Sequence, residues 1–341
     1  MSVVQEMLES YRSRLLSRDR EIQRDLTRRW LRVEEALRGQ IDALVMEMNA
    51  LRDAGQPVSR NMVYRLERYR TLLAQIEAEQ RRYADAAAGI ISAEQQYALQ
   101  LGFDWGTDAV ATLAREAGLV ASLVRLDRSV VEAMVGYTAD GTPLAKLLSA
   151  DYPATAAQLT DALIEGVALG YNPRKTARMM RDAMAGNLQR ALVVARTETQ
   201  RAHRAATVES YRQSGLVQTY TRRAALDDRT CLACLLEDGR RYPVSEQFGD
   251  HPNGRCTAIP DVPGVASPIE QTGREWFEAQ DEAVQRAIMG DGYYEAWRAG
   301  EFRLEDAARM HYDPVWGEAP QVVPLYQLVR SRGAGYTAAT R

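Results

Sequence analysis

The chain has little cysteine, histidine and lysine. Its 341 residues include three cysteines and three histidines, and two of its 43 basic residues are lysines. Three cysteines are too few, and odd in number, for a disulfide scaffold. Apolar runs end well before the ~18 residues that a transmembrane helix needs, so we expect no membrane partner. The first residues also lack the basic-then-apolar order of a secretory signal.

What is present indicates a globular protein. Hydrophobic residues make up 46% of the chain, which is enough for a sizeable core, and the length suggests two or three domains. A net charge of −3 excludes a generally basic, polyanion-binding protein. The preference for arginine over lysine has two readings: a GC-rich genome, or selection for the planar fork that recognises phosphate.

The N-terminal third predicts an antiparallel helical hairpin. Apolar residues recur every three or four positions over residues 8–52, with no proline, which is typical of one long helix. Gly55-Gln56-Pro57 would end it, and Ser59 is a candidate N-cap for a second helix with a similar stripe. Two long stripes joined by a short turn favour a hairpin.

The rest of the chain divides by composition. A boundary is expected at Gly102–Gly106, followed by helices over 108–150, 154–169 and 173–213, with Pro173 at a first helical position. From Gly215 the chain is rich in Gly, Pro and Asp, with strand patterns at 217–222 and 240–244. Helix returns from Glu270, and the end from Pro320 looks extended. The predicted fold is mainly α: a hairpin (1–101), a helical domain with a basic last helix (102–215), a small α+β Cys/His module (216–268), and an acidic helical segment with an extended tail (269–341).

Charge is unevenly distributed along the chain. Residues 171–223 hold eleven basic and three acidic side chains, whereas residues 270–318 hold five basic and twelve acidic ones. The two segments either neutralise each other in the fold or leave the basic helix free to face phosphate. In the second case the candidate contacts with double-stranded DNA are Arg174, Lys175, Arg178, Arg181, Arg190, Arg201 and Arg204.

All three cysteines lie close together with one histidine. Cys231, Cys234, His251 and Cys256 form the pattern C-x2-C-x16-H-x4-C. A C-x2-C turn supplies two ligands of a tetrahedral zinc site, and a second pair ~15–20 residues on closes it. Three thiolates and one imidazole leave no open position, so the predicted zinc is structural. It would also hold together a segment with few large apolar residues.

Other interpretations of this cluster compete. The cysteines are alternatively ordinary buried thiols, or Cys231 and Cys234 form a redox pair. An HNH-type, metal-dependent nuclease is a sharper alternative because of Asp250-His251, although the only later histidine, His311, is expected in a distant helix. His203 is expected to be a solvated helix residue. Serine-hydrolase, zinc-protease and P-loop signatures are missing, and Asp227 is expected to cap the turn before the first cysteine.

The order of these motifs resembles that of the phage head morphogenesis family, the minor head proteins similar to the Mu F protein. Ala195-Arg-Thr-Glu198 on a helix is followed by Asp227-Asp-Arg-Thr-Cys-Leu-Ala-Cys234, a Glu237-Asp-Gly-Arg240 turn and His251-Pro-Asn-Gly-Arg-Cys256. The likeness spans about 155–310. Where the family often has a first cysteine in H-P-x-C-R-C, this chain has Gly254.

The resemblance implies a minor structural and assembly protein of a tailed-phage head, with no enzymatic activity required. Such proteins associate with the portal vertex inside the capsid and bear on DNA packaging or ejection. The implied partners are the portal protein, the major capsid or scaffolding protein, and packaged DNA bound without sequence preference. The implied location is the virion, and the host cytoplasm during assembly. Fusion to an ADP-ribosyltransferase-type toxin is disfavoured, since no E-x-E motif stands beside an S-T-S strand.

Overall fold

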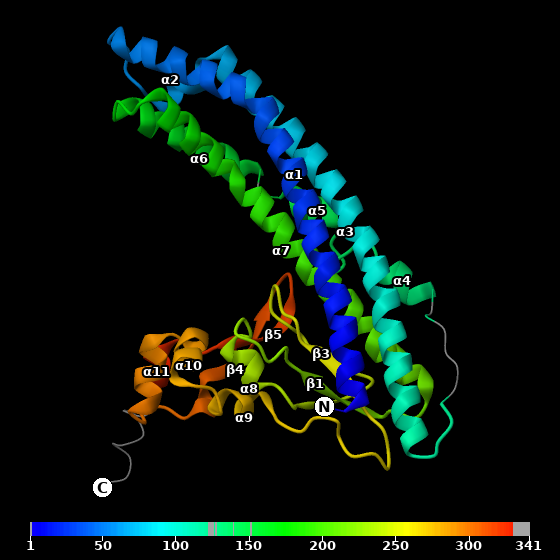
Figure 1. Ribbon diagram of the computed structural model, residues 1–341. Helices are drawn as coiled ribbons and strands as arrows, with labels where there is room; N and C mark the ends of the chain where they lie inside the picture. Colours follow the sequence, from blue (N-terminus) through cyan, green and yellow to red (C-terminus); the bar gives the residue numbers. More distant parts are fainter. Residues whose placement is uncertain (1, 122–125, 127, 139, 151, 330–341) are drawn as a thin grey trace. The chain divides into compact units, whose positions relative to one another are not determined.

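The computed structural model describes residues 2–121, 126, 128–138, 140–150 and 152–329. Three long helices dominate it: α1 (Val3–Asp53), α3 (Glu67–Glu116) and α7 (Pro173–Ser214) (Figure 1). Shorter helices lie between them: α2 (Arg60–Arg65), α4 (Arg128–Met134), α5 (Leu144–Ser149) and α6 (Tyr152–Ala168). The prediction of a mainly α protein with a small α+β module is confirmed.

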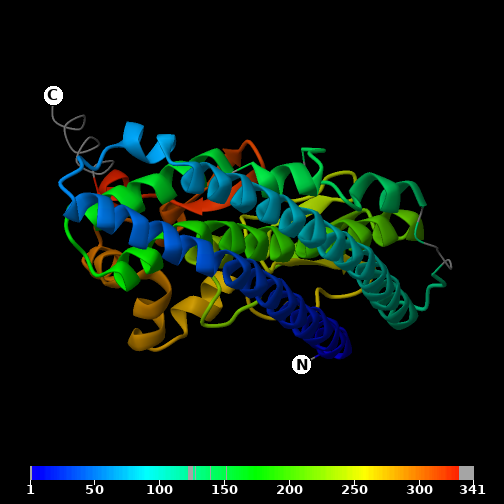
Figure 2. The same cartoon turned by 90° about the horizontal axis from the view of Figure 1, so that it is seen from above.

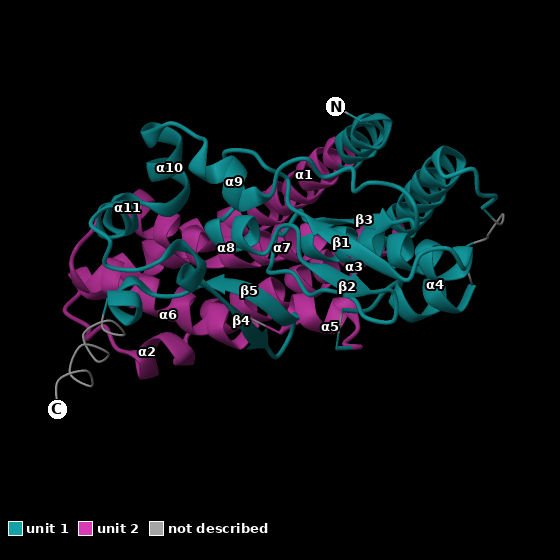
Figure 3. Cartoon of the chain, turned by 90° about the horizontal axis from the view of Figure 1, so that it is seen from below, with its two compact units in different colours: residues 1–15, 95–140, 197–341 teal, residues 16–94, 141–196 magenta. Residues whose placement is uncertain are grey.

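The chain forms two compact units, and each long helix contributes to both (Figure 3). Unit 1 comprises residues 1–15, 95–140 and 197–341, and unit 2 comprises residues 16–94 and 141–196. The four-part division made from the sequence therefore stays a prediction. No helix of the described residues is long and apolar enough to span a bilayer.

Unit 2 is helical, and the parts of α1, α3 and α7 that belong to it run alongside one another: α1 from residue 16 onward, α3 up to residue 94 and α7 up to residue 196 (Figures 1 and 2). The apolar stripe of the sequence is its core: Leu26, Trp30 and Leu37 are fully buried. The Trp30 ring meets the Tyr83 ring edge-on at 5.0 Å between centroids, and the Tyr83 hydroxyl donates to the Leu26 carbonyl. These contacts pair α1 with α3 in antiparallel order, which confirms the predicted hairpin.

The predicted caps are also found. The Ser59 hydroxyl accepts a hydrogen bond from the Met62 amide at the start of α2. Asn172 accepts from the Arg174 amide, and Pro173 takes the first position of α7, where its missing N–H costs nothing. The start of α7 is thus where the sequence placed it, whereas the second helix of the hairpin, expected from Ser59, is divided at Leu66 into the short α2 and the long α3.

The helix boundary expected at Gly102–Gly106 is absent, because α3 continues to Glu116. A Cβ at Gly102 would lie 2.1 Å from the His203 carbonyl oxygen, and one at Gly106 would lie 1.9 Å from the Ser210 hydroxyl. These glycines allow α3 and α7 to approach closely within unit 1 and do not break the helix. The helix expected over 108–150 is correspondingly replaced by the end of α3, α4 and α5.

Unit 1 carries the strands and the Cys/His segment. β1 (Thr219–Arg223) pairs antiparallel with β2 (Arg241–Pro243) on one side and β3 (Thr257–Asp261) on the other. Between β1 and β2 lies the short helix α8 (Leu232–Leu236). Both predicted strands of this segment are present. The buried face of the sheet packs on the ends of α1, α3 and α7 through Tyr211 and Tyr220.

After the sheet come α9 (Gly273–Glu278), α10 (Glu282–Met289) and α11 (Asp291–Arg298), then a 3-10 turn (Leu304–Ala307). The chain then forms a hairpin of β4 (Ala308–Asp313) and β5 (Gly317–Val322). The sequence predicted helix and an extended end here and missed this hairpin. His311 therefore lies on β4, not in the expected helix, and residues 330–341 of the predicted tail lie outside the described residues.

Candidate metal centre

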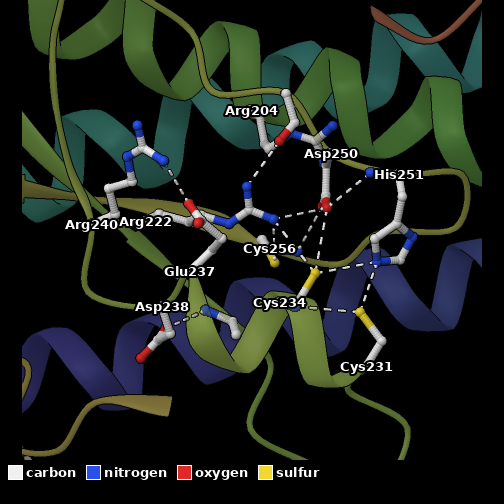
Figure 4. A network of polar contacts seen from close by, with 12 residues as sticks. Arg204, Arg222, Cys231, Cys234, Glu237, Asp238, Arg240, Asp250, His251 and Cys256 are labelled. Carbon is white, nitrogen blue, oxygen red and sulfur yellow. Dashed lines mark hydrogen bonds and ion pairs between the residues drawn. The ribbon is translucent and has the colours of Figure 1, made fainter. Parts of the chain in front are cut away.

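The four predicted ligands come from three adjacent pieces of unit 1 (Figure 4). Cys231 is the N-cap of α8, and its sulfur accepts a hydrogen bond from the Cys234 amide in the first turn of that helix. His251 lies in the loop between β2 and β3, and Cys256 directly precedes β3. The sheet thus brings the second pair of residues to the first.

The ligand atoms form two overlapping sets. His251 Nε2 lies 3.2 Å from both Cys231 Sγ and Cys234 Sγ, and the atoms of these three residues lie within 4.8 Å of one another. Cys234, Cys256 and Asp250 form the second set under the same limit. Cys234 belongs to both. The sequence named four members of this cluster, and the structure adds the Asp250 carboxylate.

Cys231 and His251 are oriented so that Sγ and Nε2 could both bind a cation. His251 Nδ1 lies 2.8 Å from the Pro252 carbonyl oxygen, so it donates there and directs Nε2 at the sulfurs. Hydrogen bonds from Cys234 and His251 lower the pKa of the Cys231 thiol to about 4, against the opposing effect of burial. The hydrogen bond to Cys231 in turn raises the pKa of His251 to about 9. In this state the Cys231 thiolate faces the Nε2 proton of the His251 imidazolium. A metal ion that replaced this proton would bind the same two atoms, Sγ and Nε2.

Arg222, on β1, is the central residue that sequence reasoning missed. Its side chain is fully buried, and Nη2 donates to Cys256 Sγ (3.3 Å), Cys234 Sγ (3.5 Å) and Asp250 Oδ1 (3.0 Å). Burial alone would lower its pKa, but Cys256, Asp250 and Cys234 together raise it well above the usual value. Arg222 therefore stays charged, and after the hydrogen bond from Cys234 its charge helps to lower the pKa of the Cys256 thiol.

Asp250, which the sequence offered only as half of the nuclease-type pair Asp250-His251, is buried in the cluster and explains Gly254. The buried carboxylate accepts hydrogen bonds from Arg222, from the Cys256 amide and from Arg204. A Cβ built on Gly254 would lie 2.2 Å from this carboxylate. The space beside residue 254 is thus taken by Asp250, at the position where the family pattern often carries a further cysteine.

This contact gives a first prediction. Gly254→Ala is expected to lower the free energy of unfolding by roughly 1–3 kcal/mol, because the new methyl group displaces a buried carboxylate with several partners. Urea denaturation of the purified chain measures it. Gly186→Ala on α7 is the matched control, since no atom lies within 4 Å of a Cβ there, and alanine favours helix over glycine. Equal stability of Gly254→Ala and wild type would contradict the assignment.

The remaining motif residues hold the loops around the cluster. Arg255 makes two hydrogen bonds, of 2.5 and 2.6 Å, to the Asp227 carboxylate, which also accepts from Thr230 and from the Arg229 amide. These contacts lower the pKa of Asp227 despite its partial burial. The capping role expected of Asp227 is present, and its pairing with Arg255 ties the first cysteine turn to the histidine loop.

Asp238, in the Glu237-Asp-Gly turn, joins three segments. Its carboxylate accepts from the Ala224 amide (2.6 Å), the Gly273 amide (2.7 Å) and Arg223 Nη1 (2.8 Å). The Asp238 carboxylate is buried. Burial of a charged group is costly unless the group is hydrogen-bonded, and these three donors supply the hydrogen bonds. The sheet, α8 and α9 are therefore fixed to one another at this turn.

The donor set fits a structural zinc ion better than a catalytic one. Thiolate and imidazole are the ligands that zinc prefers. Cys231, Cys234 and His251 would fill three positions of a zinc ion, and Cys256, which the structure groups with Cys234 and Asp250, would supply the fourth. Arg222 and Asp250 would then lie around it, where such groups orient ligands and balance charge. A metal held in this way would supply folding energy and a fixed loop geometry.

The predicted DNA-contact residues divide into two groups. Arg174, Lys175 and Arg178 are exposed at the start of α7 in unit 2. The other four have partners within the protein: Arg181 lies 3.8 Å from Asp42, Arg190 donates to the Leu147 carbonyl, Arg201 pairs with Glu198, and Arg204 pairs with Asp250.

The Ala195-Arg-Thr-Glu198 stretch lies on α7 beside the histidine loop. The Thr197 hydroxyl accepts from the Asn253 amide, where the backbone takes a positive φ of 64°. Glu198 is fully buried, and its carboxylate accepts from Arg201 and from Gln95 on α3. Burial raises the pKa of Glu198, an effect that Arg201 opposes. This part of the motif thus positions the loop that carries His251.

His203, expected to be solvated, is instead 4% exposed within unit 1. Its Nε2 is buried without a hydrogen-bond partner among the described residues. Burial, followed by the charges of Arg204 and Arg12, lowers the pKa of His203 to about 3. The histidine faces the interior because α7 packs against α3 at Gly102, which the sequence pattern did not reveal.

A second prediction concerns acid stability. An unfolded histidine titrates near pH 6.5, so the neutral, buried His203 contributes stability above that pH, and this is lost as pH falls toward 3. By pH 4.5 the loss is expected to reach roughly 2–3 kcal/mol. Urea unfolding at pH 7.5 and 4.5 measures it. His203→Gln is expected to shrink the difference between the two pH values, and an undiminished difference would contradict a neutral His203.

Residues 157–259 match the family model described as "Phage Mu protein F like protein". The matched segment runs from α6 through α7, the cysteine turn and the histidine loop into β3. The resemblance predicted from the motifs is thus confirmed over these residues. No curated protein and no solved structure gives a match.

Proposed function

We propose that the protein is a minor structural and assembly component of a tailed-phage head, placed at the portal vertex inside the capsid. One observation carries the proposal: the match to the Mu F-like family model covers residues 157–259, which contain the whole Cys/His cluster and the helix that supports it. The long α1–α3 hairpin adds an extended helical surface of the kind that suits a partner such as the portal, capsid or scaffolding protein.

The proposal includes a structural zinc site. Under this proposal, zinc is held by Cys231, Cys234, His251 and Cys256, and the bound zinc fixes the sheet and the two loops of unit 1. The ligands lie on the short helix α8, in the loop after β2 and directly before β3, so a metal bound to all of them would join these segments and supply folding energy. No chemical turnover is required for this role.

The nuclease alternative needs an imidazole that is available to activate water. His251 instead directs Nε2 at two sulfurs and Nδ1 at the Pro252 carbonyl. His311 is exposed on β4. The arrangement therefore favours a structural zinc site over a nuclease site. Nicking of supercoiled DNA that depends on Mg²⁺ or Zn²⁺, and that disappears in a folded His251→Ala variant, would instead support the nuclease.

The location is tested in a phage or prophage that encodes the chain. Mass spectrometry of purified, DNA-filled heads is expected to detect the protein at a few copies per particle. Deletion of its coding sequence is expected to leave particles that are defective in DNA content or infectivity. Absence of the protein from purified heads, with normal heads formed in the deletion strain, would overturn the proposal.

DNA contact is tested on the exposed start of α7. A combined Arg174→Ala, Lys175→Ala and Arg178→Ala variant is expected to weaken binding to duplex DNA of any sequence and to reduce the salt slope by roughly 2–3, because each phosphate contact contributes about 0.9. The control removes equal charge from exposed positions of α1: Arg20, Arg28 and Arg32, each changed to alanine. If both variants lost the same affinity for duplex DNA, the binding would reflect general charge attraction. That result would contradict a DNA-binding surface at the start of α7.

A further inference from the structure

A small cavity of unit 1 lies beside the Cys/His cluster and is lined by two of the predicted DNA contacts, Arg201 and Arg204. Its volume is about 220 Å³. One wall is α7 and another is the loop that precedes His251, while Trp316, from the turn between β4 and β5, closes a third side. The residues that matter for its chemistry are Arg201, Arg204, Gln247, Phe248, Asp250 and Trp316.

The cavity is lined by two guanidinium groups, of which Arg204 is buried and Arg201 is half-buried. Arg204 has a side chain 10% exposed, and within the described residues its one ion pair is with Asp250, at a long 3.4 Å. Asp250 is shared with Arg222, which approaches it more closely, at 3.0 Å. One carboxylate thus serves two guanidinium groups. Arg201 is the second guanidinium that lines the cavity, and it is held by Glu198 at 2.6 Å and by the Tyr137 carbonyl.

The electrostatic state of Arg204 agrees with this geometry. Burial lowers its pKa, Asp250 and Cys256 oppose the effect, and Arg222 and Arg201 lower the pKa further. A buried cation is costly unless it is fully paired. An anion in the cavity would meet the N–H groups of Arg204 and Arg201 that protein partners leave available, in surroundings where Phe248 and Trp316 reduce competition from water.

We infer that this cavity binds a phosphate group. Two guanidinium groups present several fixed N–H donors, which match a tetrahedral oxyanion better than a monatomic ion. The volume lies below the ~300–1,000 Å³ of pockets for drug-sized ligands, so it admits one such group and not a whole cofactor. The phosphate comes either from a small soluble phosphate compound or from the backbone of nucleic acid. The inference goes beyond the proposed function and requires neither the zinc ion nor a place in the phage head.

The test is calorimetric titration of the full chain with inorganic phosphate, at constant ionic strength set with chloride. Saturable binding to wild type is expected, together with a rise in melting temperature that chloride does not give. Arg204→Gln is expected to weaken binding at least tenfold. Because this variant also leaves Asp250 with fewer partners, Gln247→Trp provides a second test: it changes an exposed rim residue and blocks the cavity without removing charge.

The matched control is Gln56→Trp, an exposed glutamine of unit 2 far from the cavity in sequence. It is expected to bind phosphate as wild type does. A short DNA duplex added as competitor identifies the source: displacement of phosphate from wild type assigns the cavity to a nucleic-acid backbone, and binding without competition assigns it to a soluble phosphate compound. No saturable binding to wild type, or unchanged binding in a folded Gln247→Trp variant, would overturn the inference.

Discussion

Arg222→Met is expected to lower the free energy of unfolding by about 3–5 kcal/mol, because it leaves a buried carboxylate and two cysteine sulfurs without their shared cation. Asp250 would keep Arg204, but only at 3.4 Å, and the sulfurs of Cys234 and Cys256 would lose their N–H donor. Methionine keeps most of the side-chain volume, so the loss reports the charge and its hydrogen bonds and not a cavity.

The matched control for this variant is Arg241→Met on the neighbouring strand β2. Arg241 also forms an ion pair, with Asp261 at 3.2 Å, but its side chain is 67% exposed. Exposed pairs contribute less than about 1 kcal/mol, so the control should remain close to wild type in urea denaturation. If Arg222→Met lost no more stability than Arg241→Met, the central role assigned to Arg222 would be wrong.

A double-mutant cycle measures the interaction energy of Arg222 with Asp250 separately from the other contacts of the two residues. Asp250→Asn combined with Arg222→Met is expected to cost less than the sum of the two single changes, because each single change already removes the interaction. Strict additivity would mean that the two residues act independently, which their 3.0 Å contact does not allow.

His251→Ala is expected to have the second large effect: loss of bound metal and cooperative unfolding of unit 1 at a much lower temperature. Under the proposal, His251 is the one nitrogen ligand, and a metal bound to it would join its loop to the two cysteines of α8. Removal of a ligand from a closed structural site removes folding energy directly. Thermal unfolding followed by circular dichroism, with metal content measured on the same sample, tests this.

The control is His311→Ala. His311 is exposed on β4 and lies outside both ligand sets, so its loss should change neither metal content nor melting temperature. A chelator should reproduce the His251→Ala result in wild type and have no effect on the melting temperature of the variant. A His251→Ala protein that keeps its metal and its stability would show that the imidazole is no ligand.

The sequence was most informative where one local pattern decides the structure. The stripe through Leu26, Trp30 and Leu37 predicted α1 because a helix buries every third or fourth residue, and Ser59 and Pro173 marked helix starts for local reasons. The clustering of all three cysteines with His251 was visible for the same reason: metal-ligand spacing is a short-range pattern.

What the sequence did not reveal depends on contacts between distant segments. Arg222 looks like any polar residue of an alternating strand, and only the pairing of β1 with β3 places it against Cys256. Asp250 was noticed as a neighbour of His251, but its burial needs Gly254 and Arg204. The glycines of α3 were interpreted as a break because their packing partner lies about a hundred residues away. The β4–β5 hairpin was missed within an acidic, helix-like composition.

The proposed structural metal ion is held by the cluster of Cys231, Cys234, His251 and Cys256. Elemental analysis of freshly purified protein, with native mass spectrometry for stoichiometry, tests this proposal most directly. We expect about one zinc per chain, as a closed four-ligand site requires. In Cys231→Ser we expect the zinc to be lost together with the fold of unit 1. A metal-free chain that is fully folded and has three titratable thiols would contradict it.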